Sequence, residues 1–153
     1  LTLIEMNGPS DSDPPQLVGL FADQRMPSFV AAYRVRDWDW GCGERGCPAA
    51  FLDHRDVTLL GLGALTGESV SIPSRNAEVY GGGFKVLVLY ADEQGITLGY
   101  TREDSVANGY SVHMENFCVD PNLLASYRTA NAQGRINLPG IRNGEVVGIA
   151  SAG

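Results

Sequence analysis

The sequence contains few basic and few metal-binding side chains. Its 153 residues include 11 Lys or Arg against 18 Asp or Glu, a formal net charge of −7, and Lys85 is the single lysine. Nucleic-acid binding needs clustered cations to neutralise phosphates, and anionic membranes attract polybasic segments, so neither partner is predicted. The 2 histidines are too few for a zinc site that uses three or four imidazoles.

Long hydrophobic runs are also missing. The longest uninterrupted apolar stretch is Val86 to Ala91, whereas a helix needs roughly 20 apolar residues to span a bilayer. We therefore predict no membrane span. Hydrophobic residues make up 44% of the chain and charged residues 19%, which is the ordinary balance of a globular domain that buries its own core.

Cysteine is scarce, but two of the 3 cysteines lie close together. Cys42 and Cys47 enclose Gly-Glu-Arg-Gly, a short flexible loop that a disulfide can close, and the spacing does not match a CxxC redox or zinc motif. We predict a Cys42–Cys47 disulfide; pairing with Cys118, or three reduced thiols, stays open. In the predicted arrangement Cys118 is the odd thiol, either buried or available to a second chain.

The first 27 residues differ from the rest of the chain. Three prolines and several turn formers lie between positions 7 and 15, and this composition excludes a helix or a central strand. We predict an N-terminal arm or linker at 1–27 and a single β-rich domain at 28–153. The apolar residues of 17–21 can dock onto that domain or onto a neighbouring copy.

From residue 28 onward the hydrophobic pattern has a period of two residues, as in β-strands. The run 84–91 is apolar on both faces and is predicted to be a central strand. One helix is expected at about 121–133, because Asp120 can cap it and Pro121 suits its first turn. The predicted fold class is therefore all-β, a barrel or sandwich of antiparallel strands with one short C-terminal helix.

The two tryptophans form the most distinctive candidate for binding. Trp38 and Trp40 flank Asp39 and so share one face of an extended segment beside the cysteine loop. Aromatic faces next to carboxylates suit the C–H-rich faces and hydroxyls of sugars. The alternative, in which both rings fill a corner of the core, has equal weight at this point.

Further polar candidates lie at strand ends. Arg102 and Asp104 share a face, where a structural ion pair is favoured over a pair of carboxylates for glycoside hydrolysis. His113 and Glu115 share a face of a later strand. The predicted contact surface for a polysaccharide or surface glycan comprises Trp38, Trp40, Tyr100, Arg102, Asp104, His113 and Glu115.

A metal site is an alternative interpretation of the histidines. His54, Asp56 and His113 occur in the order of a 2-His-1-carboxylate iron site. An acidic β protein often places a carboxylate two positions from a histidine, so the favoured interpretation is no metal and no cofactor.

Five segments carry a resemblance to known proteins: 83–91, 96–98, 100–104, 109–110 and 118–124, with Tyr-Thr-Arg-Glu-Asp and Cys-Val-Asp-Pro as the most specific runs. They resemble a module of large secreted bacterial proteins of unassigned activity, over about residues 33–148. That module is similar to the duplicated-hybrid-motif β-barrel of lysostaphin-type peptidoglycan metallopeptidases. Those enzymes bind zinc through HxxxD and HxH motifs, and this sequence has neither. The resemblance implies a non-catalytic role at the cell surface or outside the cell.

We therefore expect a non-catalytic extracellular module that binds polysaccharide or another surface component, as part of a larger protein or assembly. One rival is an enzyme, either glycan-active or a mononuclear-iron enzyme. The other is a structural subunit that polymerises through the arm at 1–27.

Overall fold

The all-β fold class is confirmed by a computed structural model, which describes residues 11–53, 59–101 and 109–152. All of its described strand pairs are antiparallel. The elements in chain order are η1 (Leu17–Leu20), β1 (Ser28–Tyr33), β2 (Arg36–Asp39), β3 (Cys47–Phe51), β4 (Leu59–Gly63), β5 (Ser69–Val70), β6 (Phe84–Ala91), β7 (Gly95–Gly99), β8 (Ser111–Glu115), β9 (Phe117–Val119), α1 (Pro121–Ala132), β10 (Gly140–Arg142) and β11 (Gly148–Ala150).

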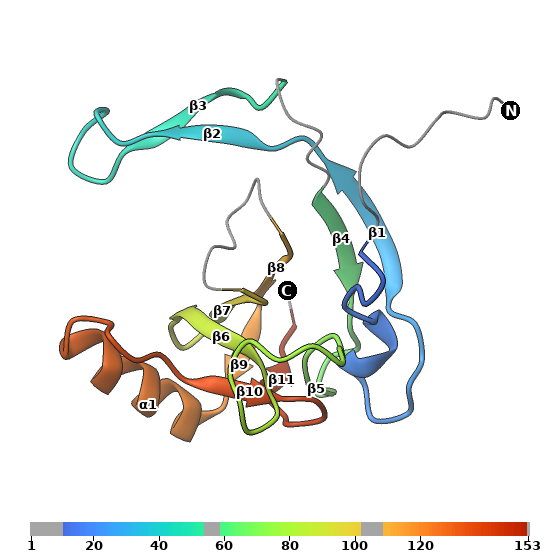
Figure 1. Ribbon diagram of the computed structural model, residues 1–153. Coiled ribbons are helices and arrows are strands. Elements are labelled where there is room, and N and C mark those ends of the chain that lie inside the picture. Colours follow the sequence, from blue (N-terminus) through green and yellow to red (C-terminus); the bar gives the residue numbers. More distant parts are fainter. Residues whose placement is uncertain (1–10, 54–58, 102–108, 153) are drawn as a thin grey trace, which may run out of the picture.

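The strands form four separate sheets. A four-stranded sheet has the order β10-β6-β7-β8, a three-stranded sheet has the order β5-β11-β9, and β1 with β4 and β2 with β3 form two-stranded ribbons. Within the described residues no sheet closes on itself, so the sandwich-like form of the expected fold is the one observed. Figure 1 shows the two larger sheets together in the body of the molecule.

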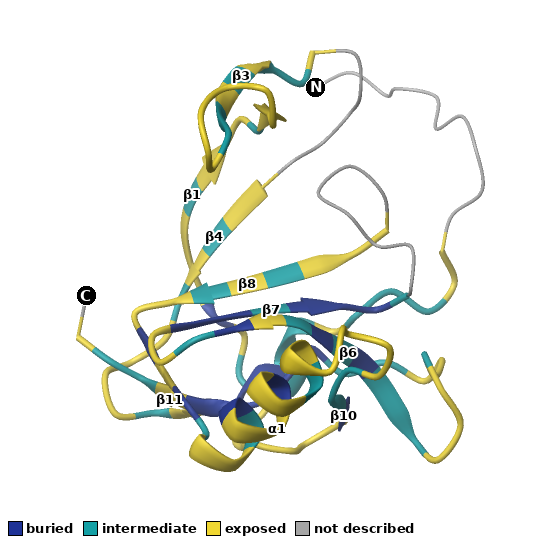
Figure 2. Ribbon diagram, turned by 90° about the vertical axis from the view of Figure 1, so that its left-hand side faces the viewer, coloured by how far each residue is buried: buried dark blue, intermediate teal, exposed yellow. Residues whose placement is uncertain are grey.

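The core lies between these sheets. Strand β6 is central, as predicted, and its Val86 and Val88 are fully buried together with Ile96 and Leu98 of the neighbouring β7. Each such side chain stabilises the fold by about 1.5–3 kcal/mol relative to exposure. Figure 2 shows this burial concentrated in β6, β7 and the elements beneath them.

The one α-helix of the described residues begins at Pro121, as predicted, and ends at Ala132, one residue before the predicted end. The side chain of Asp120 accepts hydrogen bonds from the backbone N–H groups of Asn122 and Leu123, both at 3.0 Å. Such an N-cap satisfies donors that the first helical turn leaves unpaired. Leu124 and Tyr127 are buried against the core, so α1 covers one side of the body.

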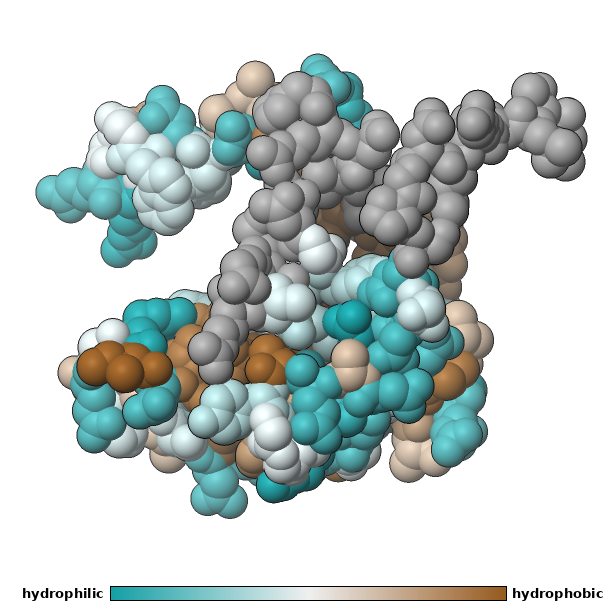
Figure 3. Space-filling view, viewed as in Figure 1, coloured by the Kyte–Doolittle hydropathy of each residue, from teal (hydrophilic) through white to brown (hydrophobic). Residues whose placement is uncertain are grey.

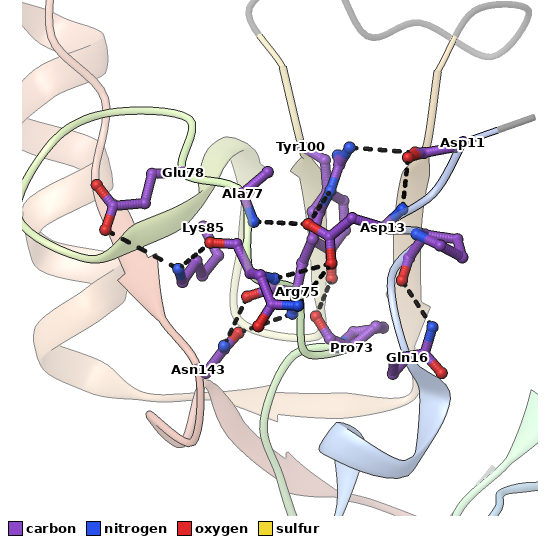
Figure 4. A network of polar contacts seen from close by, with 12 residues as sticks. Asp11, Asp13, Gln16, Pro73, Arg75, Ala77, Glu78, Lys85, Tyr100 and Asn143 are labelled. Atoms are coloured by element: carbon purple, nitrogen blue, oxygen red, sulfur yellow. Dashed lines mark hydrogen bonds and ion pairs between the residues drawn. The ribbon is translucent and has the colours of Figure 1, made fainter.

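The described part of the predicted arm docks onto its own domain. The backbone N–H of Gln16 donates to the Ser74 carbonyl at 2.7 Å, and Leu20 and Phe21 belong to the hydrophobic core. Figure 4 shows the polar contacts that Asp11 and Asp13 make with the body. Of the two docking alternatives for residues 17–21, the structure contains the intramolecular one.

The two ribbons project from the body. The β1–β4 ribbon rises from it, and the β2–β3 hairpin runs across the far end (Figure 1). Figure 3 shows this hairpin as a group of side chains set apart from the body. None of the described residues between 28 and 63 belongs to the buried core, although the sequence places them in the same β-rich domain.

Candidate functional site

The β2–β3 hairpin carries the two tryptophans at its end. Strand β2 pairs with β3 with Trp38 opposite Pro48 and Asp39 opposite Cys47. The predicted disulfide between Cys42 and Cys47 is present, with a Cα–Cα distance of 5.5 Å. The covalent bond closes the loop directly beside both indole rings, and it restricts the conformations open to a hairpin that has little packing of its own.

Both indole rings are accessible to solvent. Trp38 is 44% exposed and Trp40 is 79% exposed. Their ring centroids lie 6.1 Å apart with an interplanar angle of 64°, an edge-to-face arrangement. The alternative in which the rings fill a corner of the core is therefore wrong.

The base of the hairpin has its own polar contacts. The guanidinium groups of Arg34 and Arg36 each lie 4.0 Å from the centroid of the Phe51 ring. Arg34 also donates to Asp53 at 2.6 Å, and Arg36 donates to the Ala49 carbonyl at 3.1 Å. These contacts hold the two arginines against β3. The hairpin end exposes the Trp pair beside the charged loop residues Glu44 and Arg45.

A second candidate lies at the end of the four-stranded sheet. A shallow hollow of about 250 Å³ is lined by Tyr90, Asp92, Gln94, Gly95, His113, Glu115 and Asn116. Two of the predicted contact residues meet here, since His113 Nε2 lies 3.1 Å from Glu115 Oε1. The other ring nitrogen, His113 Nδ1, lies 2.7 Å from the Thr97 hydroxyl, which the β7–β8 register places opposite.

Asp92 gives the hollow its acidic character. Its carboxylate accepts hydrogen bonds from the Gln94 backbone N–H and the Tyr90 hydroxyl, both at 2.8 Å. These bonds stabilise the ionised form and lower the pKa of Asp92, and the same hydroxyl bond raises the pKa of Tyr90. In the sequence, residues 92–95 have only the composition of a turn. Turn carboxylates beside a predicted strand end were the available signal.

Tyr100 was wrongly placed in the predicted contact surface. It is only 3% exposed, and its hydroxyl donates to the Pro73 carbonyl in the interior. Burial raises the pKa of this phenol. Tyr100 is therefore a core residue that no surface ligand reaches.

The remaining predicted residues fall outside the described part of the chain. These are Arg102 and Asp104 of the contact surface, and His54 and Asp56 of the iron alternative. In the described ranges, no group of three or more His, Cys, Asp or Glu side chains is placed to hold a metal ion. Both ribbon views separate the hairpin end from β8, so the Trp pair and the His113–Glu115 pair are distinct surfaces (Figures 1 and 2).

Cys118 is a free, exposed thiol. Over the residues that the structure describes, no helix has the length and apolar character to cross a membrane.

No protein-family model matches this sequence, and neither a curated protein nor a solved structure matches it significantly.

Proposed function

We propose that the chain is a non-catalytic extracellular module that binds polysaccharide or another cell-surface component through the end of its β2–β3 hairpin. The observation that carries this proposal is the pair of exposed indole rings on a projecting, disulfide-closed hairpin. Exposed tryptophan is costly in water and is enriched at binding hot spots. A disulfide persists in oxidising compartments, which supports an extracellular location, as does the resemblance to a secreted module.

The geometry of the two rings favours a sugar as the ligand. Because their planes are 64° apart in edge-to-face contact, the two indoles do not form one flat platform, and a sugar ring would stack on a free indole face. Burying both indoles contributes a few kcal/mol, part of which offsets the entropy lost on association. We therefore expect a dissociation constant in the micromolar to millimolar range, about −4 to −8 kcal/mol.

The enzyme alternative would use the hollow that contains His113. The order Thr97 hydroxyl, imidazole, Glu115 carboxylate matches the parts of a nucleophile-activating relay. However, the His113 and Glu115 side chains are 48% and 75% exposed, and a solvated pair of this kind contributes little stabilisation. This hollow is therefore the weaker candidate, and His113 and Glu115 are kept as a secondary contact surface.

The proposal can be tested directly because the chain has only two tryptophans. We expect soluble polysaccharides from a panel of cell-wall and capsular types to shift or quench the intrinsic emission of the native protein. The double variant Trp38→Ala/Trp40→Ala should lose at least 10-fold in affinity by calorimetry. The matched control is Ile136→Ala, since Ile136 is 87% exposed but lies beyond α1; it should bind normally.

The unfolding midpoint in urea should be nearly equal for all three proteins. Unchanged binding by the double variant would overturn the proposed site. Release of new reducing ends from a bound polysaccharide would instead favour the enzyme.

A further inference from the structure

The Cys42–Cys47 disulfide lies beside the Trp pair and away from the core. Its two cysteines are 5 positions apart in the chain, and the strand register places Cys47 opposite Asp39, the residue between the two tryptophans. The buried core contains none of the described residues of the β2–β3 hairpin. The disulfide therefore constrains the proposed binding surface and not the packing of the body.

Backbone pairing alone holds the hairpin end weakly. Among the described residues, β2 and β3 pair only with each other, and an isolated two-stranded hairpin is at best marginally stable in water. Opposite Trp38 lies Pro48, which has no backbone N–H to donate to the strand pairing. The Cys42 N–H lies 3.4 Å from the Asp39 carbonyl oxygen, longer than the usual length of about 2.7–3.2 Å. The covalent bond is therefore the main constraint on the hairpin end.

The position of Trp38 depends directly on the closed loop. A Cβ added at Gly46 would overlap the indole nitrogen of Trp38 and would lie 2.9 Å from the Asp39 carbonyl oxygen, so the backbone of Gly46 packs against the indole ring. Gly46 immediately precedes Cys47, and the S–S bond therefore fixes the backbone that supports this ring. Trp38 in turn makes the edge-to-face contact with Trp40.

The disulfide is also accessible to thiols from solvent. Cys42 is exposed and Cys47 is half-buried, and the loop residues Gly43, Glu44 and Arg45 between them are exposed. Exposed disulfides are the labile and regulatory ones, whereas buried structural disulfides resist reduction. The bond therefore lies where a small thiol reductant reaches it.

We propose that the Cys42–Cys47 disulfide is a redox switch of the Trp pair. The oxidised loop holds the two indoles in their binding geometry, and a thiol reductant opens the loop and releases them. For a loop as short as 42–47, closure by a disulfide restricts the open conformations roughly 40-fold. The consequence for ligand binding rests on the proposed function, because the switch acts on the same hairpin end. The chain would bind in an oxidising compartment and lose its ligand in a reducing one.

The switching reaction is a thiol–disulfide exchange with a dithiol. One thiolate of the reductant attacks Sγ of Cys42, the S–S bond breaks, and Cys47 leaves as a thiolate that takes up a proton. The second thiolate of the reductant then attacks the mixed disulfide and releases Cys42. The protein gains two electrons and two protons, and the dithiol is oxidised to its own disulfide.

The test compares the oxidised and reduced forms of the full chain. All proteins carry Cys118→Ser, so that the exposed third thiol takes no part in the exchange. Dithiothreitol followed by iodoacetamide gives the reduced form, and mass spectrometry counts the capped thiols. Calorimetry with a polysaccharide that binds the oxidised chain should show at least a 10-fold loss of affinity on reduction. Reduced, uncapped protein should regain binding after treatment with oxidised glutathione.

The variant Cys42→Ser/Cys47→Ser is the matched control for the capping groups. It keeps both indoles but has no S–S bond, and it should bind as weakly as the reduced chain. The midpoint of urea unfolding should be nearly equal for all forms, because the hairpin lies outside the core.

Two measurements follow the switch without any ligand. Both tryptophans of the chain lie on this hairpin, so the tryptophan bands of the near-ultraviolet circular dichroism report its geometry alone. We expect these bands to weaken on reduction. Hydrogen exchange should become faster in residues 36–51 and remain unchanged in β6 and β7.

The outcomes separate this inference from the proposed function. Equal affinities of the oxidised chain, the reduced chain and the double serine variant would overturn the switch and leave the proposed binding site intact. Failure of the oxidised chain to bind any polysaccharide would overturn the proposed function, and the switch would then be decided by the ligand-free measurements. Unchanged tryptophan bands and unchanged exchange in residues 36–51 would overturn it. A fall in the urea midpoint on reduction would also overturn it, because the disulfide would then stabilise the whole fold.

Discussion

The body and the projecting ribbons contain similar residues but place them in opposite environments. In the body, Leu98 of β7 is fully buried, whereas in the ribbon Leu60 of β4 is 51% exposed. Both residues belong to antiparallel strands. The difference is that β7 lies between two neighbouring strands and beneath other elements, whereas β4 has one neighbour. Burial in this protein is set by the number of packed layers rather than by local hydrophobicity.

The largest expected effect follows from this contrast between two leucines. Leu98→Ala should lower the free energy of unfolding by about 2–5 kcal/mol, because it leaves a cavity in the closed core. The identical change Leu60→Ala should alter it by no more than about 0.5 kcal/mol, because the site is already open to solvent. Urea denaturation measures both. Equal losses would show that the ribbon is an integral part of the folding unit.

Local signals explain which features were predictable from the sequence. The cap at Asp120, the apolar run of β6 and the spacing of Cys42 and Cys47 each act over a few residues, and all three predictions are confirmed. Which face of a strand other elements cover depends on the tertiary packing, which a single sequence does not show. Tyr100 and Trp40 were therefore given the same role, although one is buried and the other is exposed.

The hollow was missed for a related reason. It forms where the turn at Asp92 meets the end of β8, and the contact between Thr97 and His113 depends on the β7–β8 register. Residues that lie 16 positions apart in the chain are brought together by strand pairing. A single sequence gives the strands but not this register.

Asp13 attaches the N-terminal segment to the body of the molecule. Asp13 accepts hydrogen bonds from the backbone N–H groups of Ala77 at 2.6 Å and Asn76 at 3.2 Å, and Arg75 lies 3.6 Å from its carboxylate (Figure 4). The Ala77 bond is the main cause that lowers the pKa of Asp13. The contribution of the Asp13 carboxylate to stability is therefore complete above its unfolded pKa of about 3.9. It is lost as the pH falls through the lower pKa of Asp13 in the folded protein.

Asp13→Asn should remove part of this acid dependence, and the unfolding free energy should change less steeply below about pH 4 than in the parent. Asp23→Asn is the matched control, because the Asp23 side chain is 63% exposed and its nearest ion-pair distance, to Arg25, is 3.7 Å. Urea unfolding between pH 2 and 6 measures all three proteins, a range chosen to span the carboxylate pKa values. If the parent and Asp13→Asn curves remain parallel throughout, Asp13 is not a pH-dependent attachment between the segment and the body.

A small effect on stability is expected at two glycines in the hairpin loop, and it separates the binding surface from the fold. Gly43 and Gly46 have φ values of +72° and +71°, so alanine at either position costs about 1 kcal/mol of local strain. At Gly43 the added Cβ meets no heavy atom within 4 Å, whereas at Gly46 it overlaps the indole nitrogen of Trp38.

Both variants should unfold in urea like the parent to within about 1 kcal/mol, since the hairpin lies outside the core. Only Gly46→Ala should shift the tryptophan emission and weaken polysaccharide binding, because only this methyl group displaces Trp38. Equal binding losses in the two variants would mean that loop strain, rather than the position of the indole ring, controls the contact.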